Sequence, residues 1–173
     1  GKVIDTPKCS NCHVDIDKNR CYRSEIMYKD EKTGEVKKIA KSKPIKMFYT
    51  YQGKRYSKEV DNNDIDVLNK INENQIDYWY PVDRMCDGSE SRRNDKYGIT
   101  NVNDFYTKRN LTVLAKCFDK IEKVKDVRTR NLLMFWFSSI YSRSHKLNRY
   151  MPNHNRHVGP LSGTLYLPYF QAE

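Results

Sequence analysis

The residues best suited to chemistry in this chain lie in a long stretch that contains no carboxylate. Residues 127–172 hold six Lys and Arg side chains and no Asp or Glu, so they supply +6 of the formal net charge of +10. Such a stretch suits a surface that faces phosphate, because an Asp or Glu there would repel the polyanion. The pattern therefore predicts contact with nucleic acid. The candidate residues in it are Arg143, His145, Lys146, Arg149, Arg156 and His157.

Two interpretations of this acid-free stretch stay open. Residues 132–141 read as an apolar helix, which carries few charges of either sign. That explanation does not extend to the basic and polar residues 142–157. These fit either a nucleic-acid contact or a solvated basic loop.

Further candidates for DNA contact precede the stretch. Arg and Asn side chains can read base edges, so Arg92, Arg93 and Asn94, in a polar loop, are predicted to contribute to target recognition. Lys108 and Arg109 lie near the start of a predicted helix and are candidates for contacts to phosphate.

A cysteine pair near the N-terminus has the spacing of one zinc knuckle, Cys9-Ser-Asn-Cys12. A structural zinc site needs four ligands, and these come most often from two such pairs. The sequence has no second pair, and Cys21 supplies at most a third ligand. We therefore expect zinc to be absent or substoichiometric, with Cys9, Cys12 and Cys21 as weak candidate ligands only.

Motifs for catalysis are missing from the sequence. No two glycines stand as Gly-x-Gly, and no phosphate-binding loop or Pro-Pro element occurs. Ser162 lacks the glycine spacing of a nucleophile elbow. We expect no catalytic residue and no bound cofactor in this chain.

The hydropathy pattern argues against a membrane protein. No apolar run approaches the ~20 residues that span a bilayer, and no secretory signal is present. The chain also begins with Gly rather than Met. We expect a fragment of a longer cytoplasmic protein, with no membrane partner.

The sequence pattern predicts both strands and helices to position these residues, and thus an α+β fold. Residues 1–60 read as a β-hairpin-rich, degenerate zinc-ribbon-like module, with strands near 22–29 and 44–51 and a tight turn at Gln52-Gly53 that leads into residues 55–60. Residues 61–173 read as a mainly helical domain with long basic loops. Its predicted helices cover residues 62–73, with caps offered by the run Asp61–Asp64, about 104–123 and 127–141. Its main loop covers residues 77–100, and the segment from residue 151 onward is expected to be largely irregular, with one short strand near residues 164–167.

The core of the helical domain is predicted to form between its last two helices. The helix at 127–141 is apolar almost all round, and such a helix is normally central in a domain. The preceding helix has an apolar stripe that includes Phe118. Trp136 and Phe118 are therefore expected to be buried.

Several blocks of the second half resemble prokaryotic adenine-specific DNA methyltransferases of the restriction-modification type. The blocks occur in the same order and span residues 76–168. They are Asp77-Tyr-Trp-Tyr-Pro-Val-Asp-Arg-Met, Ser91-Arg-Arg-Asn-Asp-Lys-Tyr-Gly-Ile-Thr, Asp104-Phe-Tyr-Thr-Lys-Arg-Asn-Leu, Ser142-Arg-Ser-His-Lys-Leu-Asn-Arg-Tyr and Pro160-Leu-Ser-Gly-Thr-Leu-Tyr-Leu-Pro.

The resemblance implies a parent enzyme that uses S-adenosylmethionine to methylate adenine (N6) in double-stranded DNA. In that family a Gly-rich loop holds the cofactor and a Pro-Pro-aromatic loop holds the flipped base; both loops are absent here. The resemblance therefore assigns this chain to non-catalytic DNA binding or target recognition. Its expected partners are duplex DNA and the remaining methyltransferase domains.

An alternative function remains open on the residues alone. The chain is also compatible with a structural or protein-interaction module that links enzyme domains or subunits. Such a module would be marked by an exposed apolar patch. Binding to DNA that depends strongly on salt would favour the first function over the second.

Overall fold

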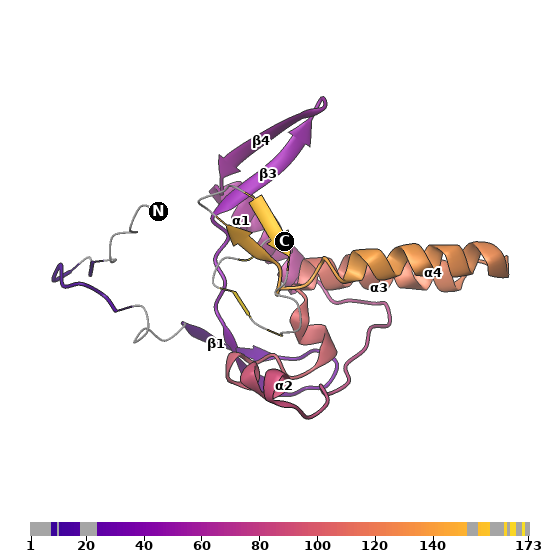
Figure 1. The fold of residues 1–173 in the computed structure, drawn as a ribbon, viewed down its shortest axis with the longest axis horizontal. Helices are drawn as coiled ribbons and strands as arrows, with labels where there is room; N and C mark the ends of the chain where they lie inside the picture. The colour runs from indigo at the N-terminus through magenta and orange to yellow at the C-terminus, as the bar shows by residue number, and fades with distance from the viewer. Residues whose placement is uncertain are drawn as a thin grey trace.

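The computed structural model describes residues 8–9, 11–17, 24–151, 156–159, 165, 167–168 and 171. Within these residues the chain is α+β, as predicted, with antiparallel hairpins and helices in one chain. Figure 1 shows two projections that extend from a small body: a β-ribbon and a pair of helices.

The two N-terminal hairpins form where the sequence places turn residues. β1 (Glu25–Lys29) pairs with β2 (Val36–Ala40), and β3 (Lys46–Tyr51) pairs with β4 (Lys54–Glu59). Gln52 and Gly53 join β3 to β4 with φ values of 48° and 74°. Two successive positive φ values suit the right-handed twist of a tight hairpin, which confirms the turn predicted there.

The helices begin at residues that cap their free amide groups. The carboxylate of Asp61 accepts from Asp64 N at 3.0 Å and starts α1, while Asp126 accepts from Thr129 N at 2.7 Å and starts α4. The helical elements are α1 (Asn62–Glu73), α2 (Ser89–Arg93), η2 (Asp95–Tyr97), η3 (Val102–Phe105), α3 (Lys108–Glu122) and α4 (Val127–Tyr141).

A third hairpin occupies part of the segment that was predicted to be largely irregular. β5 (Arg149–Met151) pairs with β6 (Arg156–Gly159). The short strand expected near residues 164–167 falls largely outside the described residues. Phe48 of β3 packs against Tyr150 of β5, with ring centroids 5.5 Å apart.

The buried core surrounds residues 97–106 and the first half of α3, not α4. One cluster contains Ile99, Phe105, Leu147 and Leu167, and a second contains Ile76, Tyr80 and Ala115.

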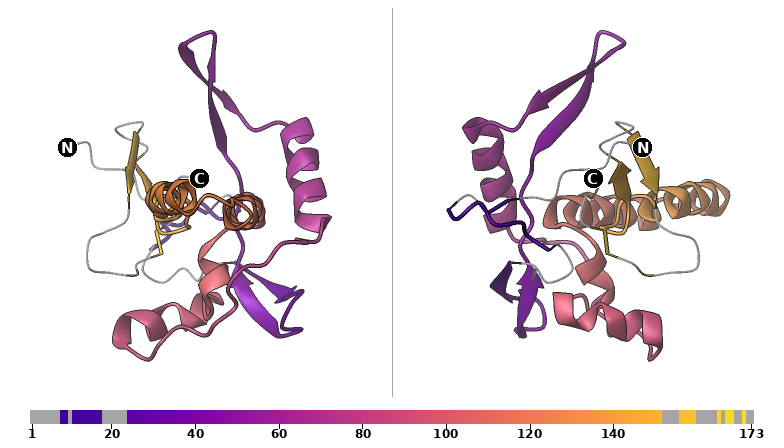
Figure 2. Two further views of the ribbon diagram at one scale, coloured as in Figure 1. Left: turned by 90° about the vertical axis from the view of Figure 1, so that its right-hand side faces the viewer. Right: turned by 60° about the vertical axis from the view of Figure 1, so that its left-hand side comes forward.

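The prediction that α4 is central is wrong, because no residue of α4 is buried and Trp136 is 52% exposed. Phe118 is half-buried and packs between Trp79 and Phe137. α4 stays exposed because α3 runs beside it and covers one side only (Figure 2).

The β1–β2 hairpin is tied to the helical part by buried polar contacts. The Asn103 amide donates to Asp30 at 2.9 Å, and Lys37 pairs with Asp104 at 2.6 Å. Asp104 also accepts from the amides of Thr100 and Asn101. The β1–β2 hairpin therefore packs directly against residues 100–104 of the helical part.

Asp30 should contribute to the acid sensitivity of the fold. Burial raises its pKa, but hydrogen bonds from Thr33, Lys32 and Asn103 outweigh this and hold the pKa below its ordinary value. A carboxyl whose folded pKa is lowered stabilises the protein above its unfolded pKa of about 3.9, and this contribution is lost as pH falls through the folded pKa.

We expect Asp30→Asn to lower the free energy of unfolding at pH 7 by roughly 1–3 kcal/mol and to flatten its decrease below about pH 4. Urea unfolding between pH 3 and pH 7 measures both effects. Asp83→Asn, at an exposed carboxylate, serves as the control. An unchanged acid limb in Asp30→Asn would contradict the assignment.

Candidate nucleic-acid interface

Three predicted base-reading residues lie on or next to α2, and two of them are engaged inside the fold. Arg92 donates to Met85 O at 2.7 Å and pairs with Asp95 at 3.4 Å. Asn94 is completely buried and donates to Leu165 O at 2.6 Å. Asn94 therefore does not face a ligand, which corrects its assignment as a base reader. Arg93 is exposed and pairs with Glu90 at 2.6 Å.

The two candidates near the start of α3 are also partly buried. Lys108 forms an ion pair with Glu31 and donates to Asn72 O at 2.8 Å. These contacts join α3 to the β1–β2 turn and to the end of α1. Arg109 is half-buried on the same turn of α3. Lys108 is thus a structural link in this conformation rather than an available phosphate contact.

The basic segment after α4 folds back onto residues 104–106. Lys146 N donates to Phe105 O, and Lys146 Nζ donates to Asp104 O at 2.9 Å. Arg149 Nε donates to Gly159 O at 3.2 Å. The side chains of Lys146 and Arg149 therefore donate hydrogen bonds to backbone carbonyls. These contacts give both residues a structural role that does not require nucleic acid.

His145 and Arg143 differ in their exposure. His145 is half-buried against Tyr106, and burial lowers its pKa, which favours the neutral imidazole. Arg143 is exposed just beyond α4. The side chains of Arg156 and His157 lie outside the described part of the chain. Of the predicted contacts whose side chains are described, Arg93 and Arg143 are exposed, and they lie on different elements.

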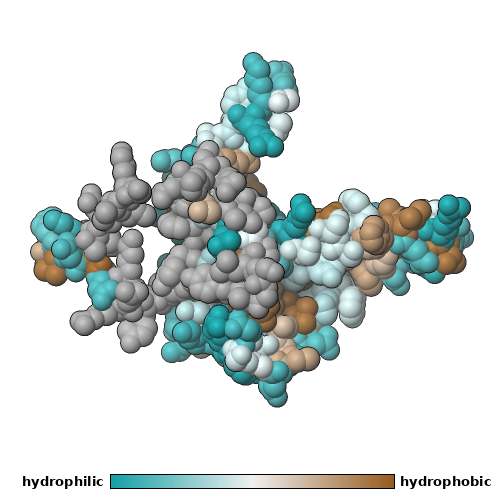
Figure 3. All heavy atoms as spheres, viewed as in Figure 1, coloured by the Kyte–Doolittle hydropathy of each residue, from teal (hydrophilic) through white to brown (hydrophobic). Residues whose placement is uncertain are grey.

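The β3–β4 ribbon presents a basic surface that the sequence reading did not select. Residues 41–60 contain six Lys and Arg and one acidic residue, Glu59. Lys54 and Arg55 lie at the free end of the ribbon, are exposed, and have no ion-pair partner among the described residues. Figure 3 shows this end as hydrophilic. The density of basic residues on one predicted hairpin was the available signal.

Tyrosines alternate with the basic residues on the ribbon. Tyr49 and Tyr56 pair across the strands, and their rings stack with centroids 5.5 Å apart. Tyr51 is 61% exposed and pairs with Lys54. Side chains of this kind can hydrogen-bond to phosphate and stack on bases, while Lys and Arg provide the charge.

The base of the ribbon is fixed to the body, whereas its tip is free. Lys58 pairs with Asp61 at 3.0 Å and with Asp64 at 2.8 Å, at the start of α1. Hydrogen bonds to Asp64 and Asp61 raise the pKa of Lys58. A two-stranded ribbon held in this way has the dimensions that enter the major groove of DNA.

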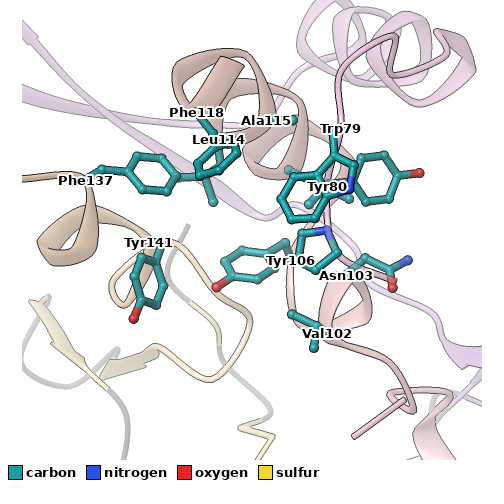
Figure 4. Close-up of a pocket in the computed structure, with 12 residues that line it drawn as sticks. Trp79, Tyr80, Val102, Asn103, Tyr106, Leu114, Ala115, Phe118, Phe137 and Tyr141 are labelled. Carbon is teal, nitrogen blue, oxygen red and sulfur yellow. The ribbon is translucent and has the colours of Figure 1, made fainter. Parts of the chain in front are cut away.

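A half-open apolar cavity of about 250 Å³ lies between the α3–α4 pair and residues 79–81 and 102–106. Figure 4 shows aromatic rings from both sides around it. The ring centroid of Phe118 lies 5.3 Å from that of Trp79 and 6.1 Å from that of Phe137. The lining is mainly apolar and aromatic, and none of the described residues that line it is a carboxylate, a histidine or a cysteine.

The Cys9–Cys12 segment has a tight turn. Cys9 N donates to Val14 O, and His13 N donates to Cys9 O. Hydrogen bonds from the backbone of Asn11 and Cys12 lower the pKa of Cys9. Cys21 lies outside the described residues. Among the residues described, no three His, Cys, Asp or Glu side chains are grouped to hold a metal, and the absence of zinc stays a prediction.

No family model matches the chain, and comparisons with curated proteins and with solved structures find no match. Across the described residues, every helix is too short or too polar to cross a membrane.

Proposed function

We propose that this chain is a non-catalytic DNA-binding region of an S-adenosylmethionine-dependent, adenine-specific DNA methyltransferase. The observation that carries the DNA-binding part is the projecting β3–β4 ribbon with Lys54 and Arg55, for which no ion-pair partner occurs among the described residues. The methyltransferase part rests on the ordered sequence blocks between residues 76 and 168. Neither part depends on the acid-free stretch alone.

The ribbon supports binding by both charge and shape. Lys41 and Lys43 are exposed where the chain enters β3, so basic side chains lie at both ends of the ribbon. These two lysines, together with Lys54 and Arg55, are assigned to phosphates, which fix the position of the duplex. Gln52, at the tip, is the group suited to hydrogen-bond with base edges in the groove.

The remaining steps of the reaction belong to other parts of the parent protein in this proposal. S-adenosylmethionine and the methyl transfer are assigned to the remaining methyltransferase domains, in the cytoplasm. The present chain then contributes affinity for DNA and orientation of the duplex.

Removing the two charges at the ribbon tip tests the proposal. Each phosphate that the protein no longer neutralises should reduce the slope of log affinity against log salt concentration by about 0.9. Because Lys54 and Arg55 are both assigned to phosphates, Lys54→Ala/Arg55→Ala should flatten this slope by about 1.8. Fluorescence anisotropy with a labelled duplex at several salt concentrations measures this. Lys116→Ala/Lys120→Ala, on the exposed side of α3, removes the same charge elsewhere and should retain the slope. Equal slopes in both variants would refute the proposal.

A protein-interaction module is a second candidate, because one observation favours it directly. α4 exposes several large apolar side chains, including Phe135 at 80% and Leu132 at 62%. The ribbon and α4 are separate projections, so both functions can coexist in one chain.

A further inference from the structure

The exposed side of α4 carries a continuous apolar stripe. Leu132, Phe135 and Trp136 are 62%, 80% and 52% exposed, and their spacing of three and four residues puts them on one face of the helix. Ser139 continues the same face. Phe137 lies on the other side of the helix and packs against Phe118 of α3. The side chains of the stripe therefore do not take part in the packing of α3 against α4.

The charges at the ends of the stripe are of one sign. Arg128 lies on this face in the first turn of α4, and Arg143 lies in the turn that directly follows the helix; both are exposed. No ion-pair partner for either occurs among the described residues. Asp126, the carboxylate nearest to this helix in sequence, is engaged in capping its N-terminus. Fifteen residues at 1.5 Å each separate the two arginines by about 22 Å.

This charge pattern disfavours a second copy of the same chain on the stripe. A two-fold antiparallel arrangement would place Arg128 beside Arg143 of the other copy, and a parallel one would place like residues together. In both arrangements, arginines of the two copies lie close together and repel each other, which weakens the association of the copies. A partner with carboxylates at these points has the complementary charge.

We propose that the α4 stripe (Arg128, Leu132, Phe135, Trp136, Arg143) binds an amphipathic helix of a protein partner, with acidic side chains about four turns apart flanking its apolar face. The large aromatic side chains at the centre provide the apolar anchors, and the arginines select the acidic partner. This inference does not depend on DNA binding by the β3–β4 ribbon.

Two designed peptides test it with the full 173-residue chain. Both are amphipathic helices with Leu on one face; one carries Glu at the two flanking positions and the other carries Lys. Because both ends of the stripe are basic, the orientation of the peptide need not be known. We expect the Glu peptide to bind about tenfold more tightly than the Lys peptide in fluorescence anisotropy.

Variants of the stripe separate its apolar and charged parts. Phe135→Ser should weaken binding of the Glu peptide at least tenfold and leave the protein folded, since that side chain is already exposed. Arg128→Glu/Arg143→Glu should reverse the preference toward the Lys peptide. Val113→Ser, at a 57% exposed residue of α3, is the control and should change neither.

Several results would overturn the proposal. These are equal affinity for the two peptides, no binding of either, or binding that Phe135→Ser does not affect. A concentration-dependent dimer that Phe135→Ser abolishes would assign the stripe to a second copy. A labelled single-stranded oligonucleotide that binds the native chain but not Phe135→Ser would assign it to base stacking instead.

Discussion

Gly98→Ala is expected to lower the free energy of unfolding by roughly 3 kcal/mol or more. Gly98 ends η2 with a φ of 73°, a conformation that costs other residues about 1–2 kcal/mol. A Cβ there would also overlap the carbonyl oxygen of Lys38 and lie 2.7 Å from Ile39 Cγ2. Both neighbours belong to β2, so the overlap would push the β1–β2 hairpin away from residues 98–104.

Gly34 provides a matched control for this prediction. It has the same φ of 73°, but no atom lies within 4 Å of a Cβ placed on it. Gly34→Ala should therefore show the conformational cost alone, about 1–2 kcal/mol. Urea unfolding of the two variants gives the difference. Equal losses would show that the close approach of Gly98 to β2 contributes nothing to stability.

Local signals in the sequence were sufficient for most of the elements. Turn residues at Gln52-Gly53 and the cap at Asp61 act within a few residues of their own position, and the β3–β4 hairpin and the helices at 62–73 and 127–141 lie where the sequence predicts them. The α+β class followed from them. The short helix α2, by contrast, lies inside the predicted loop at 77–100. The β5–β6 hairpin was missed because its strands are only three and four residues long, too short to show a periodic pattern.

The position of α4 could not be derived from its composition. A helix that is apolar all round is buried when other elements surround it, but the number of surrounding elements is a tertiary property. Here α3 covers one side, and Trp136 stays half exposed on another. The same apolar sequence is compatible with a core helix or with a partly exposed one, and the structure shows the second.

The contacts of the basic residues in the acid-free stretch could not be derived from the sequence for a related reason. The lack of carboxylates in residues 127–172 indicated basic charge, but not what that charge contacts. Lys146 and Arg149 donate hydrogen bonds to the backbone carbonyls of Asp104 and Gly159. These contacts form because residues 142–151 fold back, a tertiary feature that the composition does not reveal. By contrast, Lys54 and Arg55 lie at the tip of a hairpin, where the distance from the body leaves them unpaired among the described residues.

The buried pair of Lys37 and Asp104 should be the most sensitive polar contact in the fold. Their side chains are 12% and 7% exposed and lie 2.6 Å apart. Asp104→Asn keeps the shape of the side chain but removes its charge, which leaves the Lys37 ammonium group buried without a counter-ion. Breaking such a pair from one side costs about 3–5 kcal/mol. We expect a loss of this size in urea unfolding.

Two further variants determine whether charge is the cause. Asp119→Asn breaks the exposed pair with Lys123 on α3, which should cost less than about 1 kcal/mol. Adding Lys37→Met to Asp104→Asn removes the uncompensated charge and should restore part of the lost stability, since an apolar side chain of similar length is tolerated in such a site. If the double variant is no more stable than Asp104→Asn, the loss comes instead from the amides of Thr100 and Asn101, which donate to the Asp104 carboxylate. In that case the β1–β2 hairpin is held to residues 98–104 by the shape of the loop and by Gly98, and not by the ion pair.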